Sequence, residues 1–256
     1  EEIADSVYEC YNEGASIVHL HARDAEGLQT NDPAIFMDIN NRIRQKCNIV
    51  LQNSTAPAVR PGAKDDDGLL ELDTGAEMVS INAGILSVKF GDTKIVNMWT
   101  RDWIMNALEE IHKRGIKPEW EVHNPQNLED ILYIFQPSGL MNDPLSLSFC
   151  MNMNAQGSQR FTPQNLMHLV NMLPDQTHYH WSAMAVGGAN QHRATTLALA
   201  MGGSVRVGFE DNIYYRPGEL ATSNAQLVKR IVTVAEDMGY AIATPDEARE
   251  ILNIGK

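Results

Sequence analysis

Positive charge is scarce in this chain. Its 256 residues include 20 Lys and Arg against 33 Asp and Glu, which gives a formal net charge of −13. A chain this acidic lacks the basic surface with which proteins neutralise the phosphates of a duplex. We therefore expect no general nucleic-acid binding, although a few local cations can still hold a small anionic substrate.

Long apolar runs and paired cysteines are lacking too. No apolar run approaches the roughly 18 residues that indicate a membrane-spanning helix, and there is no signal-peptide pattern, so we expect no membrane partner. The three cysteines, Cys10, Cys47 and Cys150, are widely spaced and form no C-x-x-C pattern. We interpret them as small buried hydrophobic side chains, in keeping with a reducing, cytoplasmic setting.

The remaining composition is that of an ordinary globular protein. Hydrophobic residues make up 43% of the chain and charged residues 21%, which is enough apolar material for a sizeable core. A chain of 256 residues fits one large α/β domain better than two small ones. We therefore expect residues 1–256 to form a single domain.

Short apolar segments alternate regularly with amphipathic segments of helical period. The segments that favour strands are 15–24, 48–56, 77–84, 117–124, 145–153, 178–186 and 203–212. The segments that favour helices are 1–14, 32–46, 102–114, 126–136, 162–173, 190–201, 223–238 and 245–252. This alternation is typical of βαβ units and predicts an α/β fold with a parallel sheet.

The pattern contains seven strands and begins with a helix. A closed (β/α)₈ TIM barrel has eight strands, so a barrel requires that the first strand is missing from the chain as given. The alternative is an open, doubly wound sheet. The acidic segment 59–75 contains glycines and is interpreted as a surface loop.

Two histidines lie at the end of the first predicted strand, in the motif SIVHLHARD. His19 and His21 follow an apolar run and precede polar residues, which places them at the carboxyl end, where parallel α/β proteins gather functional side chains. Alternate residues of a strand point to the same side, about 6.6 Å apart, which suits two ligands of one metal ion. Packed or capping histidines are the alternative.

Other histidines provide a comparison. His178 and His180 form a second H-x-H, but they precede the apolar run of their strand, so a structural or surface role is favoured for them. His123 ends its own strand and is a secondary candidate, for which packing or hydrogen bonding is favoured over ligation.

Acidic residues also lie at strand ends. A metal bound by two histidines usually recruits a carboxylate, and either Glu210 or Asp211 in VRVGFEDN could provide it. Arg206 and Glu210 are an even number of residues apart, so on a strand their side chains point to the same face, and we expect a cation and a carboxylate there. In KPEWEVHN, Glu119 and Glu121 share a face, and a carboxylate that faces a barrel interior is costly unless it is paired or used.

Hydroxyl and amide side chains end two further strands. Gln52 and Ser54 share one face of QNSTA, and Ser80 and Asn82 share one face of MVSINAG. Such groups orient oxygen-rich ligands, but they also cap the helices that follow, and both readings stay open.

Taken together, these motifs resemble the β-keto acid cleavage enzyme family, whose founding activity is 3-keto-5-aminohexanoate cleavage. The resemblance covers almost the whole chain, and the motifs that carry it are GASIVHLHARD (14–24), QNSTA (52–56), EMVSINAG (77–84), KPEWEV (117–122), VRVGFEDN (205–212) and the tail LATSNAQLVKR (220–230) with ATPDEAREIL (243–252). It implies a zinc-dependent TIM-barrel catalytic domain, usually a homotetramer. Its reaction transfers an acetyl unit from acetyl-CoA to a β-keto acid and yields acetoacetate and a new CoA thioester.

The resemblance also implies roles for residues of this chain. By position, His19, His21 and Glu210 are the zinc ligands. Arg206 and Asp211 are the catalytic pair. Three other residues line the substrate pocket, Glu121 as a further catalytic group and Ser54 and Ser80 as substrate-binding groups. Asn82, on the same face as Ser80, is also predicted to bind substrate.

Two features depart from the family pattern. The family has a first strand with an acidic pocket residue, and this chain begins after it. The family also tends to have a glycine after its QxST-like motif, where this chain has Ala56 and Pro57, so the loop there is expected to differ in shape.

The expected chemistry agrees with the residue types. Cleavage of a β-keto acid between its α and β carbons develops enolate charge, which a zinc ion with open positions stabilises as a Lewis acid. Asp211 is the expected general base on the α carbon, and Arg206 orients it or holds an oxyanion. The alternatives are a metal-dependent aldolase or hydrolase that needs no acetyl-CoA, and a catalytically idle barrel that binds a sugar or an acid.

Overall fold

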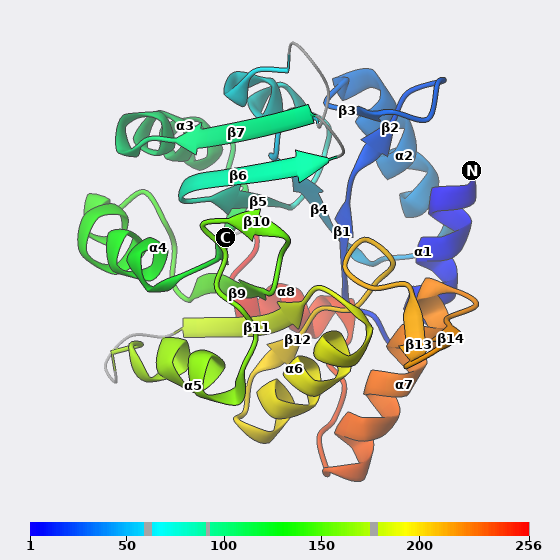
Figure 1. The fold of residues 1–256 in the computed structure, drawn as a ribbon. Coiled ribbons are helices and arrows are strands. Elements are labelled where there is room, and N and C mark those ends of the chain that lie inside the picture. The colour runs from blue at the N-terminus through cyan, green and yellow to red at the C-terminus, as the bar shows by residue number, and fades with distance from the viewer. Residues whose placement is uncertain (59–62, 91–92, 175–178, 256) are drawn as a thin grey trace.

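A seven-stranded parallel sheet forms the centre of the protein in the computed structural model, which describes residues 1–58, 63–90, 93–174 and 179–255 (Figure 1). In spatial order the strands are β1 (Ile17–Leu20), β4 (Val50–Ser54), β5 (Met78–Asn82), β8 (Lys117–Val122), β9 (Leu145–Met151), β11 (Tyr179–Ala185) and β12 (Ser204–Val205). Spatial order follows chain order, and each neighbouring pair is parallel. The sheet contains the seven strands that the sequence predicts.

Helices lie outside this sheet. Their bounds are α1 (Glu2–Asn12), α2 (Pro33–Lys46), α3 (Arg101–Lys113), α4 (Pro125–Asp130), α5 (Pro163–Asn171), α6 (Gly188–Ala200), α7 (Asn224–Asp237) and α8 (Pro245–Leu252). Ser and Thr side chains accept hydrogen bonds from first-turn amides at the start of α3, α5, α7 and α8, as expected for N-caps. The predicted helix 126–136 differs, because α4 passes into a π-helical turn at Ile131–Phe135. Among the described residues, no helix is both long and apolar enough to cross a membrane.

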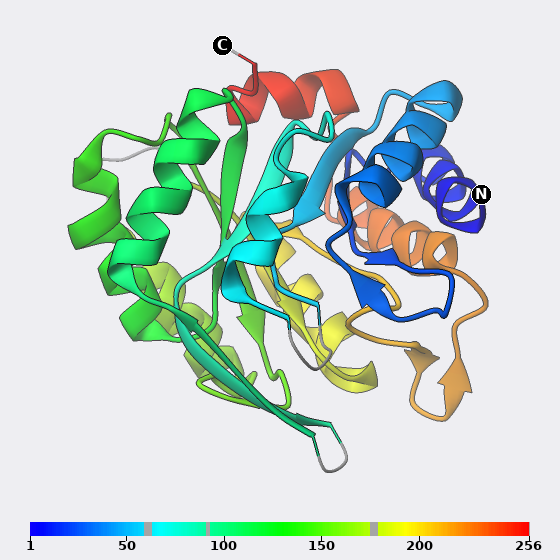
Figure 2. The ribbon, with the colours of Figure 1, turned by 90° about the horizontal axis from the view of Figure 1, so that it is seen from above.

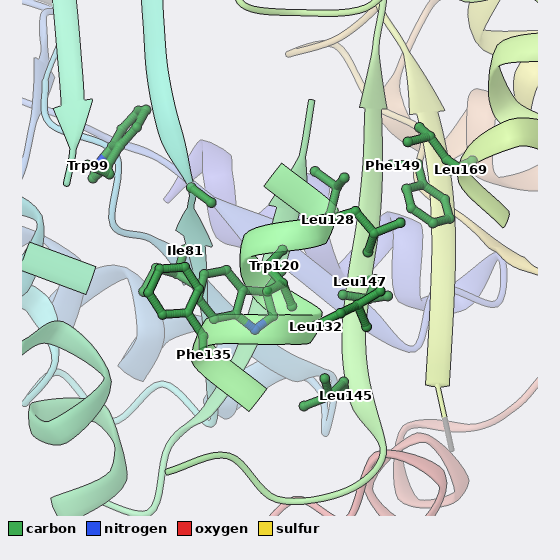
Figure 3. Packing of buried hydrophobic residues seen from close by; sticks show 14 of the residues in the cluster. Ile81, Trp99, Trp120, Leu128, Leu132, Phe135, Leu145, Leu147, Phe149 and Leu169 are labelled. Atoms are coloured by element: carbon green, nitrogen blue, oxygen red, sulfur yellow. The ribbon is translucent and has the colours of Figure 1, made fainter. Parts of the chain in front are cut away.

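The outer face of the sheet is apolar and packs against the helices. Trp120 on β8 stacks on Phe135 at 5.3 Å between ring centroids, and Leu147 and Phe149 on β9 belong to the same buried cluster (Figure 3). Because alternate residues of a strand point to opposite faces, burial of these side chains outside directs their neighbours inwards. This packing therefore fixes which residues line the interior.

The inner face is apolar at one end and polar beyond it. At the amino end of the strands, Val50 and Met78 pack against Ala248 and Leu252 of α8, which covers that end of the sheet (Figure 2). Further along the strands the buried inner positions are polar: Gln52, Ser54, Ser80, Asn82, Glu119, Glu121, Ser146 and Ser148. TIM-barrel interiors are usually filled by bulky branched apolar side chains, so this polar lining indicates a functional interior.

Two predicted strands are shorter than expected. In segment 15–24, β1 ends at Leu20, and residues beyond His21 form β2 (Ala22–Arg23), which pairs with β3 (Gln29–Thr30). The prediction of a strand across 203–212 is wrong beyond Val205. The chain turns at Gly208, whose carbonyl accepts hydrogen bonds from the amides of Asp211 and Asn212.

Two antiparallel hairpins have no counterpart in the sequence prediction. β6 (Gly84–Phe90) and β7 (Thr93–Trp99) form a hairpin that extends from the end of the sheet opposite α8, and β10 (Ala155–Gln156) pairs with β6 (Figure 2). A second small hairpin joins β13 (Tyr214–Arg216) and β14 (Glu219–Leu220). These hairpins lie outside the alternating βα pattern from which the prediction was made.

The cysteines agree largely with their interpretation. All three are free thiols; Cys10 and Cys150 are buried, whereas Cys47 is only half-buried.

Segment 59–75 is partly buried, which corrects its interpretation as a surface loop; its residues 59–62 lie outside the described part. Residues Asp65–Glu71 form a 3₁₀ helix, and Glu71 is completely buried. A methyl group on Gly68 would lie 1.8 Å from the carbonyl oxygen of Thr55, so the helix contacts the end of β4 closely. Asn31 joins the two by donating hydrogen bonds to Glu71 (3.2 Å) and to the Ala56 carbonyl (3.1 Å).

The buried Glu71 carboxyl predicts a pH-dependent stability. Burial raises the pKa of Glu71 from its ordinary 4.5 to about 9, although the hydrogen bond from Asn31 lowers it. Between these values the unfolded chain has lost this proton while the folded chain keeps it, so this group makes the fold less stable as pH rises. Glu71→Gln, which removes the titration, should gain roughly 4 kcal/mol relative to wild type between pH 5 and pH 8, because each of these three pH units costs wild type about 1.4 kcal/mol. Urea unfolding of both proteins at pH 5 and pH 8 measures this. The prediction is contradicted if the difference in free energy of unfolding between variant and wild type is the same at both pH values.

Candidate metal centre and active site

His19 and His21 lie next to each other at the carboxyl end of β1. Their rings are 5.1 Å apart between centroids, and their Nε2 atoms are 3.3 Å apart. His19 is the register partner of Gln52 on β4, so the parallel pairing of the two strands sets its direction. The two imidazoles thus present nitrogen atoms to one point inside the sheet.

Glu210 brings a carboxylate to the same point from the turn after β12. Its Oε1 lies 3.1 Å from Nε2 of His21, and its Oε2 lies 3.9 Å from Nε2 of His19. One ligand atom of each residue lies within 4.8 Å of the others, and this is the one such group of three or more His, Cys, Asp or Glu found in the described residues. Two imidazole nitrogens and a carboxylate oxygen form a donor set that suits a divalent metal.

The state of His19 suits a ligand. Burial and the positive charge of Arg206 together lower its pKa from 6.5 to about 4, although the charge of Glu210 raises it. The ring is therefore neutral near pH 7, as metal ligation requires. Its Nδ1 lies 2.7 Å from Oε1 of Gln52, which can only accept a hydrogen bond, and Nδ1 of His21 lies 2.9 Å from Nε2 of Gln29, which can only donate one. Both Nδ1 atoms are thus engaged, and the Nε2 atoms are the ones that converge.

Arg206 lies at the centre of the carboxylates. Its guanidinium donates to Glu121 at 3.0 Å, to Glu210 at 2.6 Å and to both oxygens of Asp211 at 3.1 and 3.3 Å. The side chains of Arg206, Glu121 and Asp211 are 14%, 12% and 5% exposed, so the ion pairs of Arg206 with Glu121 and Asp211 lie largely out of water, whereas Glu210 is 46% exposed. One cation therefore connects β8, β12 and the turn that carries Glu210.

The carboxylates beside Arg206 differ in basicity. Burial raises the pKa of Asp211 from 3.8 to about 6, against the lowering effect of the Arg206 charge. For Glu121 burial also raises the pKa, but the charges of Arg206 and His19 outweigh it and lower the pKa. The pKa of Glu210 is lowered as well: burial raises it, but the charge of Arg206 and the hydrogen bond to His21 dominate. Asp211 is thus the most basic of the three carboxylates.

The predicted substrate-binding residues lie on the neighbouring strands β4 and β5, and all three are buried. The Ser54 hydroxyl accepts a hydrogen bond from the Ala56 amide at 3.2 Å, whereas the Ser80 hydroxyl has no hydrogen-bond partner in the described part of the chain. Oδ1 of Asn82 lies 2.7 Å from Nε2 of His123. Their roles toward a substrate stay a prediction.

His123 and His180 do not belong to the group formed by His19, His21 and Glu210. His123 is buried and hydrogen-bonded to Asn82, in keeping with the packed role favoured for it. His180 lies at the start of β11, where its Nε2 contacts the Ser204 hydroxyl at 3.0 Å; His178 lies outside the described residues. His180 therefore lies at the amino end of its strand, as its position in the sequence indicates.

Two contacts of the histidines were not predicted. The sequence places Gln52 on the same face of its strand as Ser54, which indicates that it points inwards, but it does not predict the contact with His19. Gln29 belongs to the short strand β3, which no motif in the sequence indicates.

Comparisons with known proteins agree on one family. The model of the beta-keto acid cleavage enzyme family matches residues 1–254. The 3-keto-5-aminohexanoate cleavage enzyme of Fusobacterium nucleatum subsp. nucleatum is 37% identical over 257 residues, which cover 100% of this chain and 90% of that protein. The 3-dehydrocarnitine:acetyl-CoA trimethylamine transferase of Rhizobium meliloti is 30% identical over 280 residues, covering 100% and 89%.

A solved structure supports the fold. The binary complex of ObcA with oxaloacetate superposes with a TM-score of 0.84 at 17% identity, over 99% of this chain and 66% of that one. The chain thus spans about two thirds of that longer protein, and the likeness bears on the fold alone. It confirms the predicted α/β fold of TIM-barrel type, and the family match confirms both the resemblance of the motifs and the prediction of an enzyme. The chain belongs to the beta-keto acid cleavage enzyme family.

Proposed function

We propose that the protein is a zinc-dependent β-keto acid cleavage enzyme that converts a β-keto acid and acetyl-CoA into acetoacetate and a new acyl-CoA. The observation that carries the proposal is the convergence of His19, His21 and Glu210 beside Asp211, in a chain of this family. Support for acetyl-CoA as co-substrate comes from the name of the Rhizobium meliloti relative.

The donor set favours zinc. His₂Glu without sulfur is a ligand set of catalytic zinc sites that keep an open position. When bound, the metal would supply Lewis-acid stabilisation of the enolate oxygen that forms during cleavage. The other steps depend on the chain's own residues.

Asp211 is the proposed general base. Removal of a proton from the α carbon of the β-keto acid needs a nearby acceptor, and a pKa raised to about 6 makes this carboxylate a better one than an ordinary aspartate while it stays ionised near neutral pH. The α carbanion then attacks the acetyl thioester and releases the CoA thiolate. The thiolate attacks the original keto carbon, the bond between the α and β carbons breaks, and Asp211 returns its proton to the α carbon.

Arg206 and Glu121 hold that base in place. Two hydrogen bonds from Arg206 fix both oxygens of Asp211, and Glu121 binds the opposite part of the guanidinium. This arrangement orients the carboxylate toward one proton and counters its charge.

Ser54, Ser80 and Asn82 are proposed to bind substrate oxygen atoms. The Ser80 hydroxyl is buried without a hydrogen-bond partner in the described residues, so it is available to a ligand. Because Oδ1 of Asn82 contacts His123, the NH₂ group of this amide points away from His123 and can donate a hydrogen bond to a substrate. We also propose that the protein is a homotetramer, which is supported by the family resemblance. The three free thiols support a reducing, cytoplasmic setting.

The metal centre can be tested with a matched pair of histidine variants. Wild type should retain about one zinc per chain after dialysis, and His19→Ala should lose most of it because only two donors remain. His180→Ala, in the second H-x-H, should retain the metal because it lies at the other end of its strand. Elemental analysis measures all three, and equal metal in both variants would refute the assignment.

The role of Asp211 predicts a separation of binding from turnover. Asp211→Asn should lower kcat by roughly 10²–10⁴-fold, the usual contribution of a general base, and should leave the zinc content unchanged. Steady-state kinetics with parallel metal analysis would show this. Full activity in the variant would rule out Asp211 as the base.

The acetyl-CoA requirement separates the proposal from an aldolase or hydrolase on the same barrel. With acetyl-CoA labelled at its carbonyl carbon, the label should appear at the keto carbon of acetoacetate, and the new thioester should be unlabelled. NMR of the products from a panel of β-keto acids, with 3-keto-5-aminohexanoate included, measures both. Cleavage without acetyl-CoA would favour the alternative.

A further inference from the structure

A line of buried hydrogen bonds leads from His19 away from the proposed metal position. Nδ1 of His19 lies 2.7 Å from Oε1 of Gln52, and Nε2 of Gln52 donates to Oε2 of Glu119 at 3.0 Å. The Ser146 hydroxyl donates to the other oxygen of Glu119 at 3.2 Å. Gln52, Glu119 and Ser146 are 2%, 8% and 1% exposed, so little water competes for these contacts.

We propose that Glu119 fixes the orientation of the Gln52 amide, and that the amide in turn fixes the tautomer of His19 that can bind a metal. Gln52 and Glu119 are then positioning residues, and the inference rests on the metal centre under the proposed function. Neither residue belongs to the metal-ligand group or contacts Arg206 through a described hydrogen bond.

An amide side chain is a donor at one end and an acceptor at the other. In the observed orientation the carbonyl of Gln52 faces His19, so it accepts a proton that resides on Nδ1. The neutral ring then has its lone pair on Nε2, the atom that faces His21 and Glu210. With the amide turned over, its NH₂ group would stabilise the opposite tautomer, which presents N–H to the metal position.

Glu119 supplies the preference between these two orientations. Its two oxygens accept from Gln52 and Ser146, so a turned amide would place a carbonyl oxygen against a carboxyl oxygen in a buried site. No salt bridge to Glu119 is found among the described residues, and a carboxyl buried without one is costly. The hydrogen bonds that Glu119 accepts from Gln52 and Ser146 offset part of this cost.

Strand register accounts for two of the three contacts in this line. His19 is the partner of Gln52 across β1 and β4, and Glu119 is the partner of Ser146 across β8 and β9. Gln52 reaches over β5, whose Ser80 is the register partner of Glu119. The register partner of Gln52 on β5 is Met78, so the hydrogen bond from Gln52 to Glu119 runs diagonally across that strand.

The test uses four variants and a control. Gln52→Leu and Glu119→Leu break the line, and Glu119→Gln keeps an acceptor for Gln52. The double variant Gln52→Glu, Glu119→Gln exchanges the two side chains, so an oxygen acceptor still faces His19 and the total charge is unchanged. It provides a second test of the contact if Glu119→Leu fails to fold. Asn53→Leu is the control, because Asn53 is equally buried on β4 but donates to Thr74, away from His19.

Two measurements report on different parts of the proposal. The ¹⁵N chemical shifts of histidine side chains in metal-free protein report the tautomer of His19. Competition with a chelator reports the affinity for Zn²⁺. We expect Nδ1–H in wild type, in Glu119→Gln, in the exchange variant and in Asn53→Leu, and a mixture of tautomers in Gln52→Leu and Glu119→Leu. Zinc affinity should fall roughly 10–100-fold in the last two only, the usual effect of losing such a partner.

The outcomes separate the two proposals. If wild type binds zinc and Gln52→Leu binds it as tightly as Asn53→Leu does, the positioning role is wrong and the metal centre stands. An Nε2–H tautomer of His19 in metal-free wild type would also overturn the positioning role. If wild type binds no zinc, the metal centre itself fails, whatever the tautomer.

Discussion

The contact of Arg206 with three carboxylates is the interaction on which the site depends. Glu121, Glu210 and Asp211 all lie within hydrogen-bond distance of one guanidinium, and a single positive charge leaves two negative charges uncompensated. Burial makes such an excess costly, which is visible in the raised pKa of Asp211. A divalent cation between His19, His21 and Glu210 would restore the balance. The charges of the chain itself thus support the proposed metal centre.

The two faces of the sheet provide the setting for these charges. Apolar side chains such as Trp120 and Phe149 anchor the strands against the helices from outside, and α8 covers the amino end of the interior. Polar side chains can then occupy the remaining inner positions without loss of the core. The early end of β12 completes the arrangement, because the turn at Gly208 brings Glu210 back to Arg206 and to the histidines of β1.

The local pattern was sufficient to predict the sheet and the position of His19 and His21, the first two proposed ligands. The apolar run before His19 and His21 placed them at a strand end, and the same criterion separated them from His180. The association of Arg206 with Glu210 was also predicted, but by strand parity; the structure achieves it through a turn. The side-chain contacts of Glu119 with Gln52 could not be predicted, since strand parity identifies a shared face but not which groups meet across an intervening strand. The hairpin of β6 and β7 was not predicted, because it interrupts the alternation of strands and helices on which the prediction was based.

X-ray absorption at the metal edge tests the central claim most directly, because it reports the atoms around the bound ion. With two imidazole ligands and Glu210, zinc should show nitrogen and oxygen neighbours at about 2.0–2.2 Å, imidazole outer-shell scattering from two rings and no sulfur. Addition of a β-keto acid should add oxygen neighbours without loss of the imidazole signal. A sulfur neighbour, or a spectrum without imidazole scattering, would contradict a site built from His19, His21 and Glu210.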